Sequence, residues 1–308
     1  MNAFAGADNV YLIDTNMFGF AQYHSAYMVV GGEIALIDTG TPVSWSIVRE
    51  AIAALGLAPG DIAHVFVTHA EHPDHSGNVG SLLRENDRAV VYVSPLGAEF
   101  LTAPVVESER RKKNLSPSMA ARFGEMQPVP ASRLRLVADG DTVDLGKGLR
   151  LRVVSTPGHQ PSGFVVFEEK HGGLFINDLC GAYFADAEAS WIFTPYRSDV
   201  RQALASLGKV ESLSAERLFL GHFGISENPH EVLERSRAAM QTLLDLAAEC
   251  VRGRRPEAIE EEVLGALSIE CEKMGKVRGP ALYGYLKDEL FPSLARAFAT
   301  YYLSQPEA

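Results

Sequence analysis

The sequence predicts an α/β fold in which two β-sheets are covered by helices, followed by an all-helical C-terminal extension. Up to about residue 225, short β-branched and aromatic runs alternate with segments of helical periodicity, as in sheets enclosed by helices. Beyond Gly224 the composition changes to stretches rich in Ala, Leu and Glu. We therefore expect a catalytic α/β domain over residues 1–225 and a helical C-terminal extension over residues 226–308.

The elements follow from local patterns in chain order. Gly31 and Gly32 separate two strand-like runs and predict a hairpin. Strands are expected at Tyr27–Val30, Glu33–Ile37, Ala63–Val67, Ala89–Val93, Leu134–Val137, Leu149–Ser155, Phe164–Glu168 and Gly173–Ile176. Helices are expected at Val43–Leu55, Ser76–Arg84, Glu231–Val251, Pro256–Met274 and Pro280–Leu303, with Pro292 ending or kinking the last. The proline-containing segment 95–130 is predicted to be an inserted lid.

Composition excludes several classes of protein. The formal net charge of −11 and the pI near 5.3 argue against nucleic-acid binding, which requires a basic face. Three scattered cysteines do not form a disulfide framework or a CxxC zinc site. The N-terminus lacks the pattern of a secretion signal, and no apolar run approaches the length of a membrane span. We therefore expect a cytoplasmic protein with no membrane or nucleic-acid partner.

The stretch VFVTHAEHPDHSG, residues 65–77, carries the strongest functional signal. A short β-branched run ends in three histidines together with Glu71 and Asp74. Imidazole nitrogens and carboxylates that crowd at the end of a strand are the ligands of divalent metals. Metal chemistry is therefore the first hypothesis.

Four other segments place histidine or aspartate where an apolar run meets a Gly or Pro turn. They are Ile37-Asp38-Thr-Gly40, Ser155-Thr-Pro-Gly-His159, Phe175-Ile-Asn-Asp178 and Leu218-Phe-Leu-Gly-His222. Such positions are common for site residues on a rigid scaffold, although one histidine alone is more often structural. His24 and His171 lie outside this pattern and are expected to be surface or structural residues.

In this combination and order, the motifs resemble the metallo-β-lactamase superfamily over about the first 225 residues, including the fold of glyoxalase II. The resemblance implies a four-layer αβ/βα sandwich with a binuclear metal site. It also implies that His69, His72 and His159 bind one metal, that Asp74, His75 and His222 bind the other, and that Asp178 bridges them. Asp38 then orients a ligating imidazole.

The motif departs from the family at one point. The family run is H-x-H-x-D-H, whereas here one extra residue separates His69 from His72. Residues i and i+3 of a regular strand face opposite sides, so we expect a bulge that lets His69 and His72 converge. The alternative is a regular backbone in which Glu71 shares the face of His69, as in flavodiiron proteins. That interpretation shifts the preferred metal from zinc toward iron or manganese.

Two further patterns bear on the substrate. The basic run Arg110-Arg-Lys-Lys113 is either a solvated helix face or a surface that meets the phosphate or carboxylate of an anionic small molecule. Aromatic residues of the last helix, such as Phe291 and Phe298, are consistent with a pocket wall, core packing or a homodimer interface.

Together these observations lead to a functional expectation. The resemblance implies a hydrolase that uses two divalent metals, zinc by preference, and a metal-bridging hydroxide held by Asp74 to attack an ester-like carbonyl. Helical extensions in thioesterases of the superfamily point to a thioester. The alternatives are a non-haem iron redox protein, such as a sulfur dioxygenase, and a non-catalytic metal-binding protein.

Overall fold

The computed structural model describes residues 3–5, 9–105, 109 and 117–305, and the chain forms two compact units. The first unit comprises Met1–Ser155, Ser162–Asn177 and Ser214–Glu227; the second comprises Thr156–Pro161, Asp178–Leu213 and Asn228–Ala308. This division differs from the single boundary near residue 225 that the sequence suggested. The segment between two paired strands of the first unit leaves its sheet and folds with the C-terminal helices.

The first unit contains a seven-stranded sheet, called here the first sheet. Its strands lie in sequence order: β1 (Ala3–Ala5), β2 (Val10–Asp14), β3 (Ser25–Val30), β4 (Ile34–Ile37), β5 (Ile62–Phe66), β6 (Val90–Val93) and β7 (Leu134–Leu136). β1 to β4 pair antiparallel and β4 to β7 pair parallel. Parallel pairing places the ends of β4 and β5, which precede two of the predicted site segments, at the same edge.

The second sheet of this unit has six strands. In spatial order they are β15 (Ile225–Ser226), β14 (Arg217–Leu220), β11 (Gly173–Ile176), β10 (Phe164–Glu168), β9 (Leu149–Ser155) and β8 (Thr142–Gly146). The β3–β4 turn contacts β8, where a Cβ at Gly31 would lie 2.7 Å from the Leu145 carbonyl oxygen. Only glycine fits this close approach.

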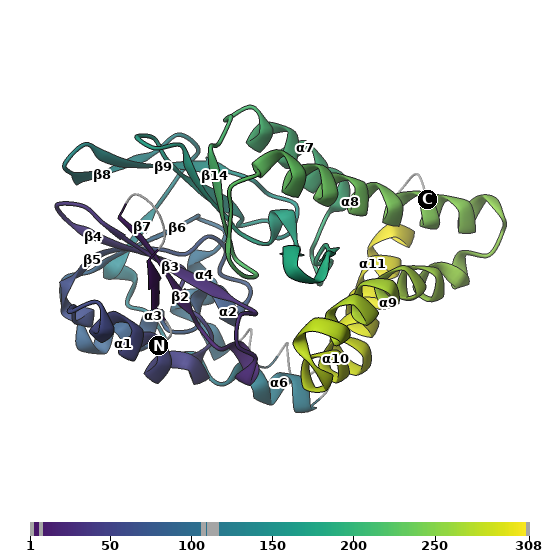
Figure 1. Ribbon diagram of the computed structural model, residues 1–308, viewed down its shortest axis with the longest axis horizontal. Coiled ribbons are helices and arrows are strands. Elements are labelled where there is room, and N and C mark those ends of the chain that lie inside the picture. Colours follow the sequence, from purple (N-terminus) through teal and green to yellow (C-terminus); the bar gives the residue numbers. More distant parts are fainter. Residues whose placement is uncertain (1–2, 6–8, 106–108, 110–116, 306–308) are drawn as a thin grey trace. The chain divides into compact units, whose positions relative to one another are not determined.

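The two sheets share a hydrophobic core, and Figure 1 shows them as separate layers of the first unit. Side chains alternate along β5, so Phe66 faces the second sheet while Val65 joins the core on the helix-covered side. That side is covered by helices such as α1 and α3 (Figure 1). The α-helices of this unit are α1 (Trp45–Ala54), α2 (Pro73–Ser76), α3 (Val79–Glu85), α4 (Ala98–Thr102) and α6 (Pro117–Phe123).

Part of the predicted lid segment belongs to the body of the first unit. Phe100, Leu101, Met126 and Val129 are buried in the core beneath the first sheet. The basic run Arg110–Lys113 lies outside the described residues.

The second unit is helical apart from one hairpin. Its elements are β12 (Ala182–Phe184), β13 (Ala189–Trp191), α7 (Val200–Glu211), α8 (Pro229–Arg252), α9 (Ile259–Arg278), α10 (Pro280–Tyr285), a π-helical turn (Leu286–Leu290) and α11 (Phe291–Leu303). Trp191 of the hairpin packs against Phe291 with ring centroids 5.3 Å apart. Phe298 is fully buried, so the aromatic residues of α11 fill the core of this unit.

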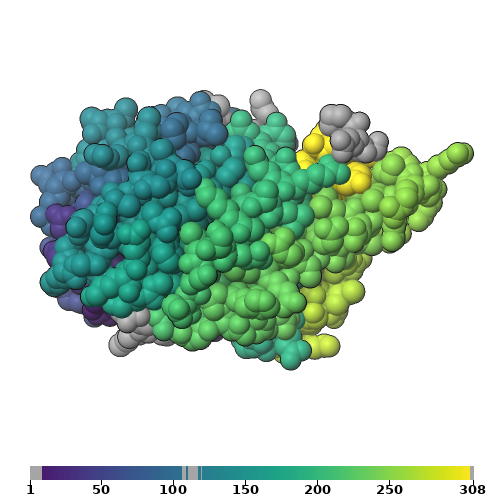
Figure 2. Space-filling view, turned by 90° about the horizontal axis from the view of Figure 1, so that it is seen from above, coloured from purple at the N-terminus to yellow at the C-terminus, as the bar shows by residue number. Residues whose placement is uncertain are grey.

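The last predicted helix contains a π-helical turn directly before its proline. Residues Pro280–Leu303 are helical throughout, with the π-helical turn at Leu286–Leu290, and Pro292 lies in the first turn of α11. The exposed segment between α8 and α9 forms the tip of the second unit seen in Figure 2. The helices in the described part of the chain are all too short or too polar to cross a lipid bilayer. The predicted α/β architecture with a helical C-terminal region is confirmed.

Candidate metal centre

The histidine-rich segment forms a loop and a short helix after β5. The strand ends at Phe66, and α2 begins at Pro73, so His69 and His72 lie on the connecting loop. The expected strand bulge between these residues is therefore wrong: the strand has ended before His69, and a loop accommodates the extra residue. Asp74 and His75 follow in the first turn of α2, where backbone geometry fixes their spacing.

Asp38 links the end of β4 to this segment. Its carboxylate accepts hydrogen bonds from the Thr68 backbone N–H at 2.9 Å and from the Thr68 hydroxyl at 2.8 Å. It lies 2.7 Å from Nδ1 of His75. Because an ionised carboxylate only accepts, Nδ1 of His75 carries the proton, and Nε2 offers the lone pair.

His222 follows β14 and approaches from the second sheet. Its Nδ1 lies 3.1 Å from the backbone carbonyl of Tyr23, which also only accepts, so Nε2 again offers the lone pair. The His222 Nε2 atom is 3.8 Å from Oδ2 of Asp74. This distance is too long for a hydrogen bond and suits two ligands that each lie about 2 Å from one cation.

His24, at the end of the β2–β3 connection, joins the same group. It is fully buried, and its ring centroid is 4.8 Å from that of His75 and 5.1 Å from that of His222. The expectation that His24 is a surface or merely structural residue missed this proximity. A histidine directly before the buried strand β3 was the available signal.

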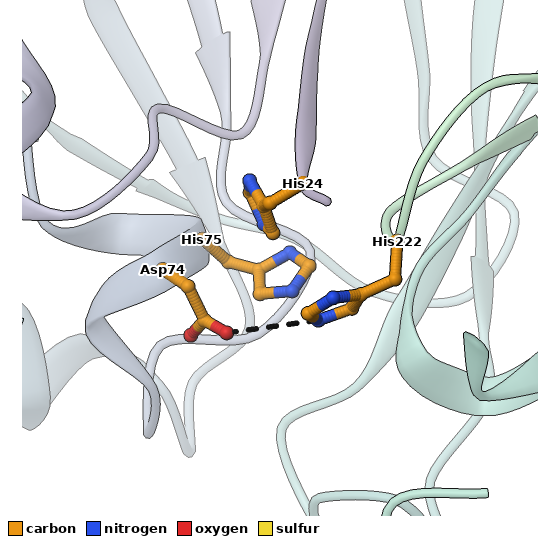
Figure 3. Close-up of side chains that lie close together, drawn as sticks. All are labelled: His24, Asp74, His75 and His222. Atoms are coloured by element: carbon orange, nitrogen blue, oxygen red, sulfur yellow. Dashed lines mark ion pairs between the residues drawn. The ribbon is translucent and has the colours of Figure 1, made fainter. Parts of the chain in front are cut away.

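The donor atoms of His24, Asp74, His75 and His222 all lie within 4.8 Å of one another, and all four side chains are buried. Figure 3 shows them converging from the β2–β3 connection, from α2 and from the loop after β14, with the Asp74–His222 contact dashed. Three neutral imidazoles and one carboxylate form a donor set that suits zinc, and imidazole also suits iron. The residues in the first unit therefore fit a divalent metal.

His69 lies beside this cluster. It is fully buried, and its ring centroid is 4.2 Å from that of His75 and 5.6 Å from that of His72. His72 is partly exposed and is not among the four converging residues.

Glu71 has a different environment from these histidines. Its carboxylate accepts hydrogen bonds from the Ala70 N–H at 3.1 Å, from the Ser162 N–H at 3.2 Å and from the Ser162 hydroxyl. Burial raises the pKa of Glu71 above its ordinary value, and the Ser162 hydrogen bond opposes that rise. Glu71 therefore ties the loop to the start of β10.

His159 and Asp178 belong to the second unit, where they lie together. Nε2 of His159 is 3.4 Å from Oδ2 of Asp178, and Nδ1 of His159 is 3.3 Å from the Phe193 carbonyl oxygen. They border a small hollow with mostly apolar walls, large enough for about one water molecule. Its lining includes Leu179, Ile192, Phe193, Val200 and Met240.

Comparisons with known proteins agree with this geometry. Residues 19–222, well over half of the chain, match the family model described as the metallo-beta-lactamase superfamily. The "Putative diflavin flavoprotein A 2" of Nostoc sp. is 28% identical over 164 residues, which are 53% of this chain but only 24% of that protein. The chain thus spans about a quarter of that relative's length.

Two other proteins extend the comparison. The uncharacterised protein YobT of Bacillus subtilis is 24% identical over 221 residues, 68% of this chain and 85% of the relative. The crystal structure of an archaeal metallo-beta-lactamase superfamily protein from Sulfolobus tokodaii aligns with a TM-score of 0.62 at 20% identity. That alignment covers 78% of this chain and 87% of the archaeal one. The chain therefore belongs to the metallo-beta-lactamase superfamily.

Proposed function

We propose that the protein is a metal-dependent hydrolase that cleaves an ester-like carbonyl compound, most specifically a thioester. Its ligands in this proposal are His69, His72 and His159 for one divalent ion, Asp74, His75 and His222 for the other, and Asp178 between them. Zinc is the preferred ion, since neutral imidazoles predominate. The assignment of His159 and Asp178 to the same centre rests on the order of the family motifs along the chain.

The observation that carries the proposal is the common orientation of His75 and His222. Each imidazole uses Nδ1 for a hydrogen bond to an acceptor of the fold, the Asp38 carboxylate or the Tyr23 carbonyl. Metal-binding histidines are oriented in this way, because the anchored Nδ1–H leaves Nε2 with its lone pair directed at the ion. The buried carboxylate of Asp74 completes the group.

Bound divalent ions supply a hydroxide nucleophile at neutral pH and polarise the substrate carbonyl. Asp74 accepts a hydrogen bond from the attacking water and holds it in line with the carbonyl carbon. Asp38 keeps the His75 ring in one orientation and one tautomer. Burial of these groups strengthens their interactions with the charge that develops during attack.

The thioester in this proposal rests on the helical C-terminal extension, a feature that thioesterases of the superfamily also carry. The hollow beside Asp178, lined by Leu179, Phe193 and Met240, has space for about one water molecule and does not itself select an acyl group.

The proposal is tested with protein reconstituted with zinc and a panel of acyl-glutathione, acyl-CoA, lactone and phosphodiester substrates. We expect the wild type to release thiol from a thioester. The rate should fall about 100-fold or more in His222→Gln, because loss of a metal ligand impairs both the formation of hydroxide and the stabilisation of negative charge on the substrate oxygen. His230→Gln is the matched control, since the side chain of His230 is 88% exposed. A metal-loaded protein that cleaves none of the four classes would refute the proposal.

Two observations favour a second candidate, a non-haem iron redox protein. A flavoprotein is among the relatives, and the H-x-E spacing of His69 and Glu71 adds a carboxylate near the histidines. The hydrogen bonds of Glu71 to Ser162 and Ala70 support the hydrolase instead, since they occupy that carboxylate in the loop. Iron content, visible absorption after aerobic purification and oxygen uptake on a persulfide separate this candidate from a colourless hydrolase.

A further inference from the structure

We infer that His24 is a further protein ligand of the metal held by Asp74, His75 and His222, which gives that ion three imidazole nitrogens in addition to its carboxylate oxygens. The inference rests on the metal centre of the proposed function. It adds a ligand from the β2–β3 connection, a part of the chain outside the histidine motif.

The position of His24 supports a role at the centre. One donor atom of His24 lies within 4.8 Å of the donor atoms of Asp74, His75 and His222. The ring packs edge-on against both His75 and His222, with interplanar angles of 81° and 85°. In Figure 3 the three rings and the carboxylate point toward one another.

The protonation of His24 follows from Thr15. The Thr15 hydroxyl donates to the backbone carbonyl of His24 at 3.3 Å and lies 3.1 Å from Nδ1 of the same residue. A hydroxyl has one hydrogen, so when it donates to that carbonyl it accepts from Nδ1, and in this arrangement Nδ1 carries the proton. His24 therefore presents Nε2 as a lone-pair donor, as His75 and His222 do.

This arrangement is the usual support of a metal-binding imidazole. Three histidines of the cluster anchor Nδ1 to three different acceptors: the Thr15 hydroxyl, the Asp38 carboxylate and the Tyr23 carbonyl. Each of these bonds holds its ring in place, and one donor atom from each imidazole lies within 4.8 Å of the others and of the Asp74 carboxylate, as in ligands of one cation. A third imidazole raises the number of protein donors on this ion, so the ion is expected to resist chelation.

Cobalt(II) titration of the metal-free protein tests the inference without an activity assay. We compare the wild type with His24→Gln, which keeps a polar group near Thr15 but removes the imidazole, and with His230→Gln as the matched surface control. We expect the tighter of two cobalt sites in the wild type to lose affinity by about tenfold or more in His24→Gln. The visible spectrum per cobalt should change as well, because the absorption bands of cobalt(II) depend on the number and kind of its ligands.

The outcomes separate the inference from the proposed function. A wild type that binds no cobalt contradicts both. A folded His24→Gln protein with wild-type affinity and spectrum overturns the role of His24 alone and leaves the hydrolase proposal intact.

Paramagnetic proton NMR of the cobalt-loaded wild type decides the question if His24→Gln does not fold. Each ligand imidazole bound through Nε2 gives one strongly shifted, exchangeable Nδ1–H signal. A signal with nuclear Overhauser contacts to the Thr15 methyl group supports the inference. Absence of such a signal, with the His75 and His222 signals present, overturns it.

Discussion

The carboxylate of Asp38 holds Nδ1 of His75 at 2.7 Å, and this contact joins the ends of β4 and α2. Asp38 adopts a left-handed backbone conformation with φ of 58°, which aims its side chain at both Thr68 and His75. A non-glycine residue in that region is uncommon, although aspartate and asparagine tolerate it best. The strained position of Asp38 therefore fixes the orientation of an imidazole in the candidate centre.

Asp38→Asn tests this relationship with a side chain of equal size and similar backbone preference. We expect metal affinity to fall by about 10- to 100-fold, because the amide no longer enforces the His75 tautomer and makes Nε2 less basic. Competition with a chelator of known affinity measures the change. Asp245→Asn, on the outer face of α8, is the control. Equal metal affinities in the two variants would show that Asp38 does not support metal binding through His75.

Gly77→Ala tests the close packing behind α2. A Cβ at Gly77 would lie 2.3 Å from both Pro42 Cδ and the Pro73 carbonyl oxygen, so α2 must shift. We expect a loss of about 1–3 kcal/mol in the free energy of unfolding and weaker metal binding, since Asp74 and His75 move with the helix. Urea unfolding and metal titration measure the two effects.

A glycine in open space is the control for that substitution. An added Cβ at Gly265, within α9, meets nothing within 4 Å. Gly265→Ala should leave metal binding unchanged and raise stability by about 0.5–1 kcal/mol through helix propensity. Destabilisation of both variants to the same extent would show that the packing of Gly77 is not special.

Glu71→Gln and His72→Gln distinguish the two interpretations of the lengthened motif. The Glu71 carboxylate accepts hydrogen bonds from the backbone N–H groups of Ala70 and Ser162. In Glu71→Gln one of its two oxygens becomes an NH₂ group, which cannot accept a hydrogen bond from either N–H. We expect Glu71→Gln to keep two metals per chain and to lose about 1–3 kcal/mol of stability. His72→Gln should lose metal. The opposite pattern, with metal lost only in Glu71→Gln, would favour the iron-type donor set.

Tyr301 provides a test in the second unit that is independent of metal. Its hydroxyl donates to Asp199 at 2.7 Å, and burial together with this carboxylate raises the pKa of Tyr301 to about 12. The folded state thus holds the proton more tightly than the unfolded state. Its contribution to stability is full below pH 10 and is lost as the pH rises toward 12.

Urea unfolding of the wild type and Tyr301→Phe between pH 8 and pH 12 measures that contribution. The difference in the free energy of unfolding should shrink across the upper part of this range. A difference that stays constant with pH would show that the Tyr301–Asp199 hydrogen bond does not couple to stability.

Much of the first unit was predictable because its strands carry strong local signals. Gly31 and Gly32 mark the β3–β4 turn, and the apolar run before His69 marks β5. The hairpin of β12 and β13 and the helix α7 were not predicted, since short strands and a helix of mixed composition have weak periodicity. The discontinuous second unit was also beyond local reasoning, because it depends on contacts between segments distant in sequence.

The candidate site was predictable as far as its residues belong to a recurring motif. Four of the predicted site residues lie close together in the first unit: Asp38 contacts His75, and Asp74 lies near His222. His24 was missed because its chain neighbours form no motif, and its relation to Asp74 arises only when β3 pairs within the first sheet. The prediction of a strand bulge was wrong because pairing with β4 and β6 sets the length of β5. This pairing ends at Phe66, before His69 is reached.

Metal stoichiometry is the most direct test of the central claim that these imidazoles and carboxylates hold divalent ions. The wild type, His222→Gln and His230→Gln are stripped with chelator, reconstituted with zinc, dialysed and analysed by inductively coupled plasma mass spectrometry. The account predicts about two zinc ions per chain for the wild type and His230→Gln, and fewer for His222→Gln. A folded wild type that retains no metal, or a His222→Gln protein that retains as much as the wild type, would contradict it.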